Sequence, residues 1–222
     1  MSLAHVADLA VAADPLELYA GGLQHQRRRL RARLASGASI RLDLDRWLGS
    51  ADAADLTVIA RATGPVLDIG CGPGRHVVAC GNHGLQALGV DVSRAAVAEA
   101  RRRGAQAVET CVFADVPDAG RWQTALLLDG NIGIGGDAPA LLRRASALLA
   151  PDGGVIVEAG RPGSATVVER VRLECETLHS AWFPWARVAI DDLPAVASRA
   201  AMAVESTWEC EGRWFARVAD VA

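Results

Sequence analysis

Two carboxylates and three glycines, closely spaced in one stretch of the chain, are the residues best suited to bind a ligand. Asp68 precedes the first glycine by two residues, and the glycines Gly70, Gly72 and Gly74 follow at every second position. Glycine permits φ > 0 and lets a ligand approach the main chain without meeting a Cβ. Asp91, about 20 residues further on, can accept hydrogen bonds from ribose hydroxyls. The pattern therefore predicts a loop that binds a nucleotide or nucleoside.

The spacing of the glycines separates the families that use such loops. It is Gly-x-Gly-x-Gly, whereas dinucleotide-binding folds use Gly-x-Gly-x-x-Gly. No Lys-Ser or Lys-Thr pair follows, which excludes a P-loop. An NAD-dependent oxidoreductase remains an alternative, although the chain has no lysine and only Tyr19 for the catalytic pair of a short-chain dehydrogenase. A non-catalytic sensor that keeps the nucleoside site is a second alternative.

An alternation of strands and helices must position these residues. The apolar run 66–69 is typical of a parallel strand that helices cover on both faces. Strand and helix patterns then alternate about every 20 residues, which predicts an open α/β sheet with right-handed crossovers. The expected elements are strands 87–90, 105–108, 124–128 and 155–158, a helix 94–103 capped by Ser93, and a helix 139–149.

The two ends of the chain predict further elements. Leucines at helical spacing with five arginines between them predict an amphipathic helix over 23–34, whose arginines form a solvated face or contact an acidic substrate or RNA. The other expected elements are helices 53–62, 164–179 and 191–203 and a hairpin of strands 204–210 and 213–218.

At this point the sequence resembles the class I S-adenosylmethionine-dependent methyltransferases. Their first motif is an apolar strand followed by Asp or Glu, x-Gly-x-Gly-x-Gly, and a Pro-x-Gly-Gly turn like that at 151–154 precedes their fifth strand. The resemblance implies an α/β fold with a Rossmann-like, doubly wound, seven-stranded sheet, mostly parallel with a C-terminal antiparallel hairpin. It also implies S-adenosyl-L-methionine as cofactor and a small organic molecule as methyl acceptor. We expect an N-terminal helical cap over 1–62 and a methyltransferase domain over 63–222.

The resemblance also implies the cofactor contacts of the first two strands. The loop 70–74, with Cys71, would pack against the methionine and ribose parts. Asp68 would lie near the methionine amino group, Asp91 on the ribose and Val92 beside the adenine.

The later strands are expected to complete the cofactor site. Val112 and Phe113 are predicted to form the adenine wall, with Asp115 or Glu109 as the acid that accepts from the exocyclic amine. The fourth strand is followed by Asp129, Gly130 and Asn131, which we expect at the methionine end or the acceptor because ligands bind at the carboxyl ends of parallel strands.

Three further patterns each have two interpretations. Asp129, Asn131 and Glu158 could hold a magnesium ion, although strand ends commonly carry acids without metal, and we predict no metal. His76 and His179 could act as general bases or be ordinary polar residues, so no catalytic residue is assigned. The aromatic residues Trp182, Phe183 and Trp185 could line an acceptor pocket or pack in the core; together with the run 129–137 they look like those of a group of bacterial methyltransferase-like proteins.

Length and composition limit the function further. With 222 residues, 51% of them hydrophobic, the chain can bury the core of one domain. A net charge of −3 provides no basic field for nucleic acid, which is not expected as a partner. The five cysteines form no C-x-x-C pair, which favours a reducing, cytoplasmic location. Neither a leader peptide nor a run of 18 uncharged apolar residues is seen, so export and membrane binding are not expected; no oligomeric state is indicated.

Overall fold

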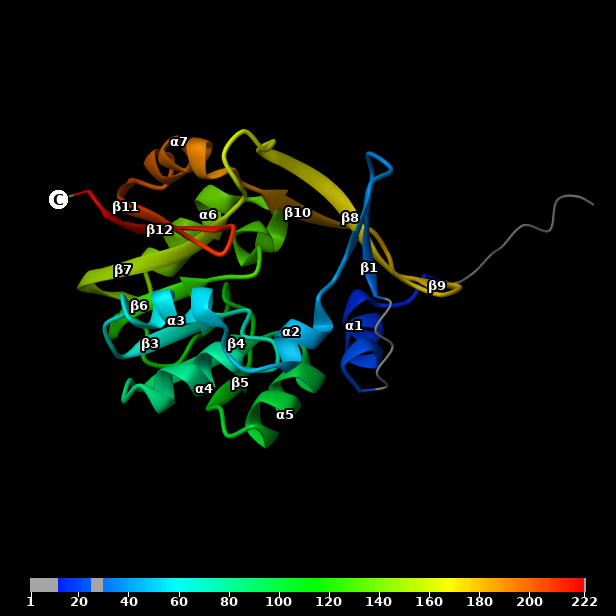
Figure 1. The fold of residues 1–222 in the computed structure, drawn as a ribbon, viewed down its shortest axis with the longest axis horizontal. Coiled ribbons are helices and arrows are strands. Elements are labelled where there is room, and N and C mark those ends of the chain that lie inside the picture. Colours follow the sequence, from blue (N-terminus) through cyan, green and yellow to red (C-terminus); the bar gives the residue numbers. More distant parts are fainter. Residues whose placement is uncertain (1–11, 25–29, 222) are drawn as a thin grey trace, which may run out of the picture.

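The computed structural model describes residues 12–24 and 30–221, which form two β-sheets with helices packed mainly on the larger one (Figure 1). The helices are α1 (Pro15–Gln24), α2 (Leu44–Leu48), α3 (Ala53–Ile59), α4 (Arg75–Asn82), α5 (Arg94–Arg102), α6 (Ala138–Ser146) and α7 (Leu193–Ser198), with 3-10 turns η1 (Asn131–Gly136) and η2 (Ile190–Asp192). The strands are β1 (Arg31–Leu34), β2 (Ser39–Arg41), β3 (Val66–Ile69), β4 (Ala87–Asp91), β5 (Ala107–Glu109), β6 (Trp122–Leu127), β7 (Leu149–Ala159), β8 (Val167–Cys175), β9 (Leu178–His179), β10 (Phe183–Arg187), β11 (Met202–Cys210) and β12 (Arg213–Asp220).

The larger sheet has seven strands in the order β11-β12-β7-β6-β3-β4-β5. The strands from β7 to β5 are parallel, and the hairpin β11–β12 adds two antiparallel strands beside β7. This arrangement confirms the predicted fold class. The chain proceeds from β3 to β4 and β5 in one direction and from β6 to β7 in the other. The order therefore reverses between β3 and β6, and the carboxyl ends of these strands form the crevice in which such sheets bind ligands.

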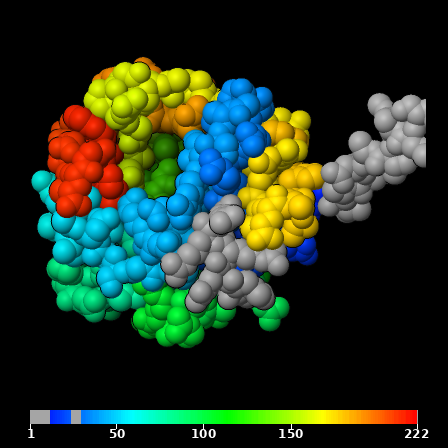
Figure 2. All heavy atoms as spheres, turned by 45° about the vertical axis from the view of Figure 1, so that its right-hand side comes forward, coloured from blue at the N-terminus to red at the C-terminus, as the bar shows by residue number. Residues whose placement is uncertain are grey.

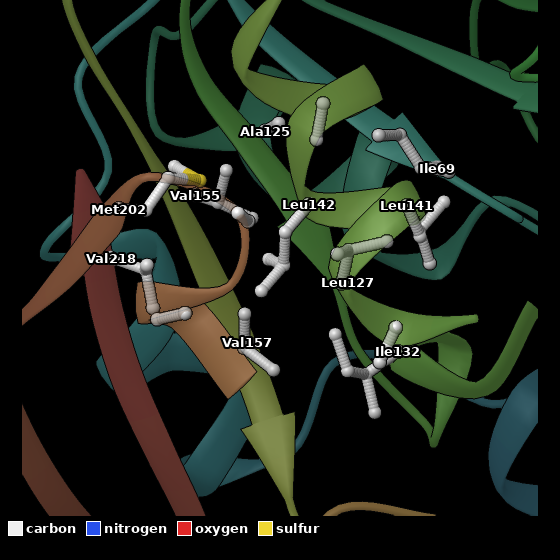
Figure 3. Packing of buried hydrophobic residues seen from close by; sticks show 14 of the residues in the cluster. Ile69, Ala125, Leu127, Ile132, Leu141, Leu142, Val155, Val157, Met202 and Val218 are labelled. Carbon is white, nitrogen blue, oxygen red and sulfur yellow. The ribbon is translucent and has the colours of Figure 1, made fainter. Parts of the chain in front are cut away.

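Two apolar layers cover the seven-stranded sheet. On one face α6 and α7 pack against the strands, with Leu141, Leu142 and Val157 among the buried side chains shown in Figure 3. On the other face α3 and α4 pack through residues such as Val58 and Cys80. Because both faces are covered, the central strands β3 and β6 are almost wholly buried and mainly apolar, as expected for parallel strands between two layers of helices.

A second sheet, in the order β10-β8-β1-β2 with β9 beside β8, was not predicted. Its strands come from two distant parts of the chain, since β1 pairs antiparallel with β8 through Leu34 opposite Val171. In Figure 1 this sheet extends beside the carboxyl ends of the larger one. The smaller sheet therefore adds a wall to the crevice.

The second sheet corrects two predicted helices. The predicted helix 164–179 is wrong, because this segment contains β8. In β8 the side chains of Val171 and Leu173 are buried, whereas the residues immediately before and after each of them are not. Such a period of two is typical of a strand with one buried face. The predicted helix 23–34 is wrong at its C-terminal end, where 31–34 form β1; residues 25–29 lie outside the described residues.

The remaining elements follow the predictions with shifted ends. Ser93 caps α5 by accepting a hydrogen bond from the Ala96 N–H, as expected. The C-terminal hairpin is confirmed, whereas the predicted helix 191–203 shortens to η2 and α7. In the N-terminal part, α3 corresponds to the predicted helix 53–62, whereas α2, β1 and β2 were not predicted and α1 lies before most of the predicted helix 23–34. Within the described ranges, no helix combines the length and hydropathy that crossing a membrane requires.

Candidate functional site

A cavity of about 1050 Å³ lies at the carboxyl ends of β3, β4, β6 and β7. The second sheet, α1 and α2 close its other sides through residues such as Tyr19, Leu42 and Trp185. Figure 2 shows the surface hollowed between the blue segment near residue 40 and the yellow-green segment near residue 165. The cavity therefore lies where the strand order reverses, which is the expected ligand crevice of an open α/β sheet.

The glycine loop after β3 is held against the end of β6. The Asn131 side-chain amide donates hydrogen bonds to the carbonyl oxygens of Ile69 (2.8 Å) and Gly70 (2.9 Å). A Cβ on Gly70 would lie 2.7 Å from that same nitrogen, and the φ of Gly70 is +72°. Glycine is therefore required at position 70 for close approach between parts of the chain, and Asn131 positions the loop.

The middle of the loop is bonded to the end of β4. The Gly72 N–H donates to the Asp91 carboxylate (2.9 Å), whose other oxygen accepts from the Ser93 N–H (2.7 Å). Burial raises the pKa of Asp91, and these two hydrogen bonds partly oppose the rise. Asp91 and Gly72 both line the cavity, so a ligand at the loop would lie beside this carboxylate.

Tyr19, on α1, closes the cavity above the glycine loop. Its hydroxyl oxygen would lie 3.1 Å from a Cβ on Gly72, and its ring packs edge-on against Trp47 at a centroid distance of 6.2 Å. Burial raises the pKa of the Tyr19 phenol, and the charge of Asp91 adds to the rise, so the phenol stays protonated and can donate a hydrogen bond. The sequence analysis gave no site role to this residue, because nothing in its local sequence places it near the loop.

The guanidinium of Arg75, a residue that lines the cavity, is buried between two carboxylates. The Arg75 side chain is 3% exposed and contacts Asp55 at 2.8 and 3.1 Å and Asp129 at 2.7 and 2.9 Å. Burial alone would raise the pKa of Asp55, but hydrogen bonds from His76 and Arg75 lower it far below its usual range. The pKa of Asp129 is also lowered, because the charges of His76 and Arg75 outweigh its burial. Both carboxylates are therefore ionised and paired.

Two further arginines extend this pairing across the strand ends. Arg213, on β12, contacts Asp55 at 2.7 Å and both carboxylate oxygens of Glu158 at 2.9 and 2.7 Å. Arg46, on α2, contacts Asp129 at 3.1 Å. We call these residues the arginine–carboxylate cluster; its members are Arg46, Asp55, Arg75, Asp129, Glu158 and Arg213.

His76 and Asp68 lie beside the cluster, and of the two His76 lines the cavity. The His76 Nε2 is 3.2 Å from Asp55, and its Nδ1 is 3.6 Å from Asp68. Burial disfavours the imidazolium, but the carboxylates of Asp55 and Asp68 raise the pKa of His76 to about 9. A histidine that is protonated at neutral pH is a poor general base. Asp68 is 1% exposed and does not line the cavity, so this placement does not support its predicted contact with the methionine amino group.

The structure brings most of the predicted cofactor residues to the cavity. The lining includes Gly70, Cys71, Gly72, Asp91, Val92, Val112, Asp129, Gly130 and Asn131. Gly74, Phe113, Glu109 and Asp115 do not belong to the lining. Gly74 serves packing, since a Cβ there would come within 3 Å of Ala100 and Ala105, and Phe113 is half exposed. Thr110 and Cys111 join Val112 on the wall where Phe113 was expected. As cofactor contacts, all these assignments remain predictions.

Of the other residues that the sequence suggested for the site, some line the cavity and some do not. Phe183 and Trp185 line the cavity, but Trp182 lies under the guanidinium of Arg172, 5.0 Å from its ring centroid. His179 pairs in β9 away from the lining. The alternative magnesium site is not supported, because Asp129 and Glu158 are occupied by arginines. Within 12–24 and 30–221, no group of three His, Cys, Asp or Glu side chains could hold a metal.

Comparisons with known proteins agree with this geometry. Residues 66–153 match the sequence model of a family described as a methyltransferase domain. A search of curated proteins gives no match.

Solved structures share the fold of this chain. A methyltransferase from Bacteroides fragilis, solved with S-adenosyl-L-homocysteine, aligns over 94% of this chain and 95% of its own at a TM-score of 0.77 and 22% identity. An N1-methyltransferase from Burkholderia thailandensis, solved with 1,6-didemethyltoxoflavin and S-adenosylhomocysteine, aligns over 79% and 82% at a TM-score of 0.56 and 20% identity. These matches confirm the predicted fold, and none supports the oxidoreductase or sensor alternatives.

Proposed function

We propose that this chain transfers a methyl group from S-adenosyl-L-methionine to a small organic acceptor; the match of residues 66–153 to a methyltransferase-domain model and the fold shared with solved methyltransferases support the proposal. One observation carries the proposal: the glycine loop, Asp91 and the residues Asp129 to Asn131 after β6 line a single cavity at the reversal of strand order. The small molecule bound by the Burkholderia thailandensis enzyme supports an acceptor of similar class here.

The residues present fit the cofactor. Gly72 offers main chain without a side chain, at the position where a Cβ would fill the space below Tyr19. Asp91 presents a buried carboxylate that already accepts two backbone hydrogen bonds and is suited to ribose hydroxyls. Val92 and Val112 supply apolar contacts suited to the adenine. The loop 70–73 and Asp91 would therefore hold the cofactor, with Tyr19 closing over it.

The cofactor, when bound, supplies a sulfonium methyl group, and a lone pair on the acceptor forms the new bond to carbon as the carbon–sulfur bond breaks and its electron pair returns to sulfur. The acceptor loses its proton to water. The chain's own residues bind, align and exclude water, which are the main contributions to such a displacement. Asp129 lines the cavity as an ionised acid, so it contributes a fixed negative charge near the donor site rather than proton transfer.

Binding and turnover test the proposal separately. Titration calorimetry with S-adenosyl-L-methionine, S-adenosylhomocysteine and NAD is expected to give binding for the first two only. Preferential binding of NAD would overturn the choice of cofactor. Release of S-adenosylhomocysteine in a screen of small hydroxyl, amine and thiol compounds is expected for at least one acceptor. Cofactor binding with no turnover across the screen would favour the sensor alternative.

The proposal also covers the cellular location of the protein, its partners and the division of the chain. We propose a cytoplasmic location, supported by five cysteines that are all unpaired. Nucleic acid is not proposed as a partner, since the net charge of −3 offers no general attraction for phosphates. We also propose a division into a cap over 1–62 and a catalytic domain over 63–222, with the cap supplying Tyr19 to the site.

A further inference from the structure

The cavity extends from the glycine loop to the second sheet, and its volume lies at the upper end of the range for ligand pockets. Ligand pockets of about 300–1,000 Å³ hold a single drug-sized molecule, and this cavity measures about 1050 Å³. Its donor half is formed by the glycine loop and the ends of β4 and β6. The remaining half lies against the second sheet, and we call it the apolar lobe; its main side chains are Leu34, Ile40, Val171, Leu173, Phe183 and Trp185.

One face of the second sheet forms the apolar lobe. On β8, Val171 and Leu173 line the cavity, whereas Arg172 between them bonds Glu174 at 2.7 and 2.9 Å and does not line it. On β1, Leu34 lines the cavity, and the neighbouring arginines do not. Side chains alternate between the two faces of a strand. The sheet is thus amphipathic: the face turned to the cavity is mainly apolar, with the Glu169–Arg187 pair as its charged exception, and the arginines of the other face are turned away.

The charges near the apolar lobe are already paired. Arg187 donates to Glu169 at 2.8 Å, and Glu158 is held by Arg213. Outside the donor half, the other charged lining residues within the described ranges are Asp14 and Arg161, both exposed at the rim. Burying a charged group without a partner is costly. An ionised acceptor would therefore find no free counter-charge inside the apolar lobe.

Resting on the proposed function, we infer that the methyl acceptor is an uncharged, largely apolar molecule with a ring. It packs on the apolar lobe with its nucleophilic atom directed to the donor half. Phe183 and Trp185, at a centroid distance of 6.2 Å and an interplanar angle of 83°, offer a ring face and a ring edge for such packing.

Two fluorescent probes with the same ring skeleton test this inference on the full chain saturated with S-adenosylhomocysteine. N-phenyl-1-naphthylamine is neutral, and 8-anilino-1-naphthalenesulfonate adds one sulfonate charge. We expect the neutral probe to bind at least tenfold more tightly, as measured by fluorescence titration. Equal or tighter binding of the anionic probe overturns the inference.

Matched variants locate the neutral probe. Ile40→Glu places a charge in the apolar lobe at a side chain that is 43% exposed, and we expect at least tenfold weaker probe binding. Leu178→Glu, on β9 at 49% exposure and outside the lining, is expected to change it less than twofold. Equal effects of the two variants overturn the inference. Failure of the wild type to bind S-adenosylhomocysteine in calorimetry refutes the proposed function instead, so the two failures are distinguishable.

Discussion

The protonated His76 beside the arginine–carboxylate cluster predicts a specific loss of stability as the pH rises. The groups that face it are Asp55 on α3, Asp68 on β3 and Arg75 on α4; the two acids favour the imidazolium and Arg75 opposes it. The pKa of His76 is raised from 6.5 to about 9. Each unit corresponds to about 1.4 kcal/mol, so the charged histidine contributes on the order of 3 kcal/mol to the free energy of unfolding.

The sign of the effect follows from the direction of the shift. The folded protein holds the proton more tightly than the unfolded chain does, so this contribution is complete below pH 6.5 and is lost as the pH rises through about 9. Between pH 6 and 8.5 the expected loss is about 2 kcal/mol. Burial also raises the pKa of the Cys71 and Cys80 thiols, so these two groups add to the loss of stability near pH 8.5, and the part of the slope that belongs to His76 is the part that a substitution of His76 removes.

Urea unfolding at pH 6, 7, 8 and 8.5 measures this dependence. His76→Gln, which retains a donor for Asp55 but cannot titrate, is expected to lower the stability at pH 6 and to remove most of the slope. His83→Gln is the control, since His83 lies outside the cluster and bonds only the Ala79 carbonyl oxygen among its described contacts. A flat wild-type profile, or an unchanged slope in His76→Gln, would refute the assignment of a protonated His76.

Three other substitutions test the loop and the cluster. Gly72→Val is expected to abolish binding of S-adenosyl-L-methionine in calorimetry, because the valine side chain would enter the cavity at Tyr19. Circular dichroism is expected to show that this variant keeps its fold. The control is Gly84→Val, at another glycine with positive φ but with open space around it, which should bind the cofactor normally. Asp91→Ala should weaken binding by about 1–3 kcal/mol, and no loss would place the ribose elsewhere. Arg75→Met should lower the free energy of unfolding by about 3–5 kcal/mol, because it removes the buried guanidinium that Asp55 and Asp129 share and leaves each carboxylate short of a partner. Arg217→Met, at a partly exposed pair, should cost less than about 1 kcal/mol in urea unfolding. Similar losses in the two arginine variants would contradict the role of the cluster.

The strands and helices of the seven-stranded sheet could be predicted well, because the residues that specify each of them lie close together in the sequence. The apolar run 66–69, the glycine spacing and the Ser93 cap each lie within a few residues of the element that they specify. The second sheet could not be found in this way. β1 has only four residues, and its partner β8 is more than 130 residues away, so its pairing is visible only in the folded chain. The period of two in β8 was the available signal, and it was read as a helix.

The residues of the candidate site differ in the same way: those specified by a local motif were predicted, and those positioned by distant contacts were not. Gly72 and Asp91 were predicted because the motif spacing alone specifies them, and they line the cavity. Tyr19, Arg75 and Arg213 were missed, since each gains its position from contacts between elements that are distant in sequence. Asp68 was placed by resemblance at the ligand, but as a side chain inside a strand covered on both faces it is directed into the protein.

The arginine–carboxylate cluster joins the N-terminal segment to the strand ends, and this bears on the proposed division of the chain. Asp55, on α3, receives hydrogen bonds from Arg75 and Arg213, and Arg46 on α2 contacts Asp129. A boundary at residue 62 therefore separates Asp55 and Arg46 from partners that are buried and charged. Because an incomplete buried ion cluster is strongly destabilising, we expect the proposed cap to fold together with the domain proposed over 63–222 and not as an independent unit. The cap thus contributes in two ways, by neutralising charges at the donor half and by closing Tyr19 over it.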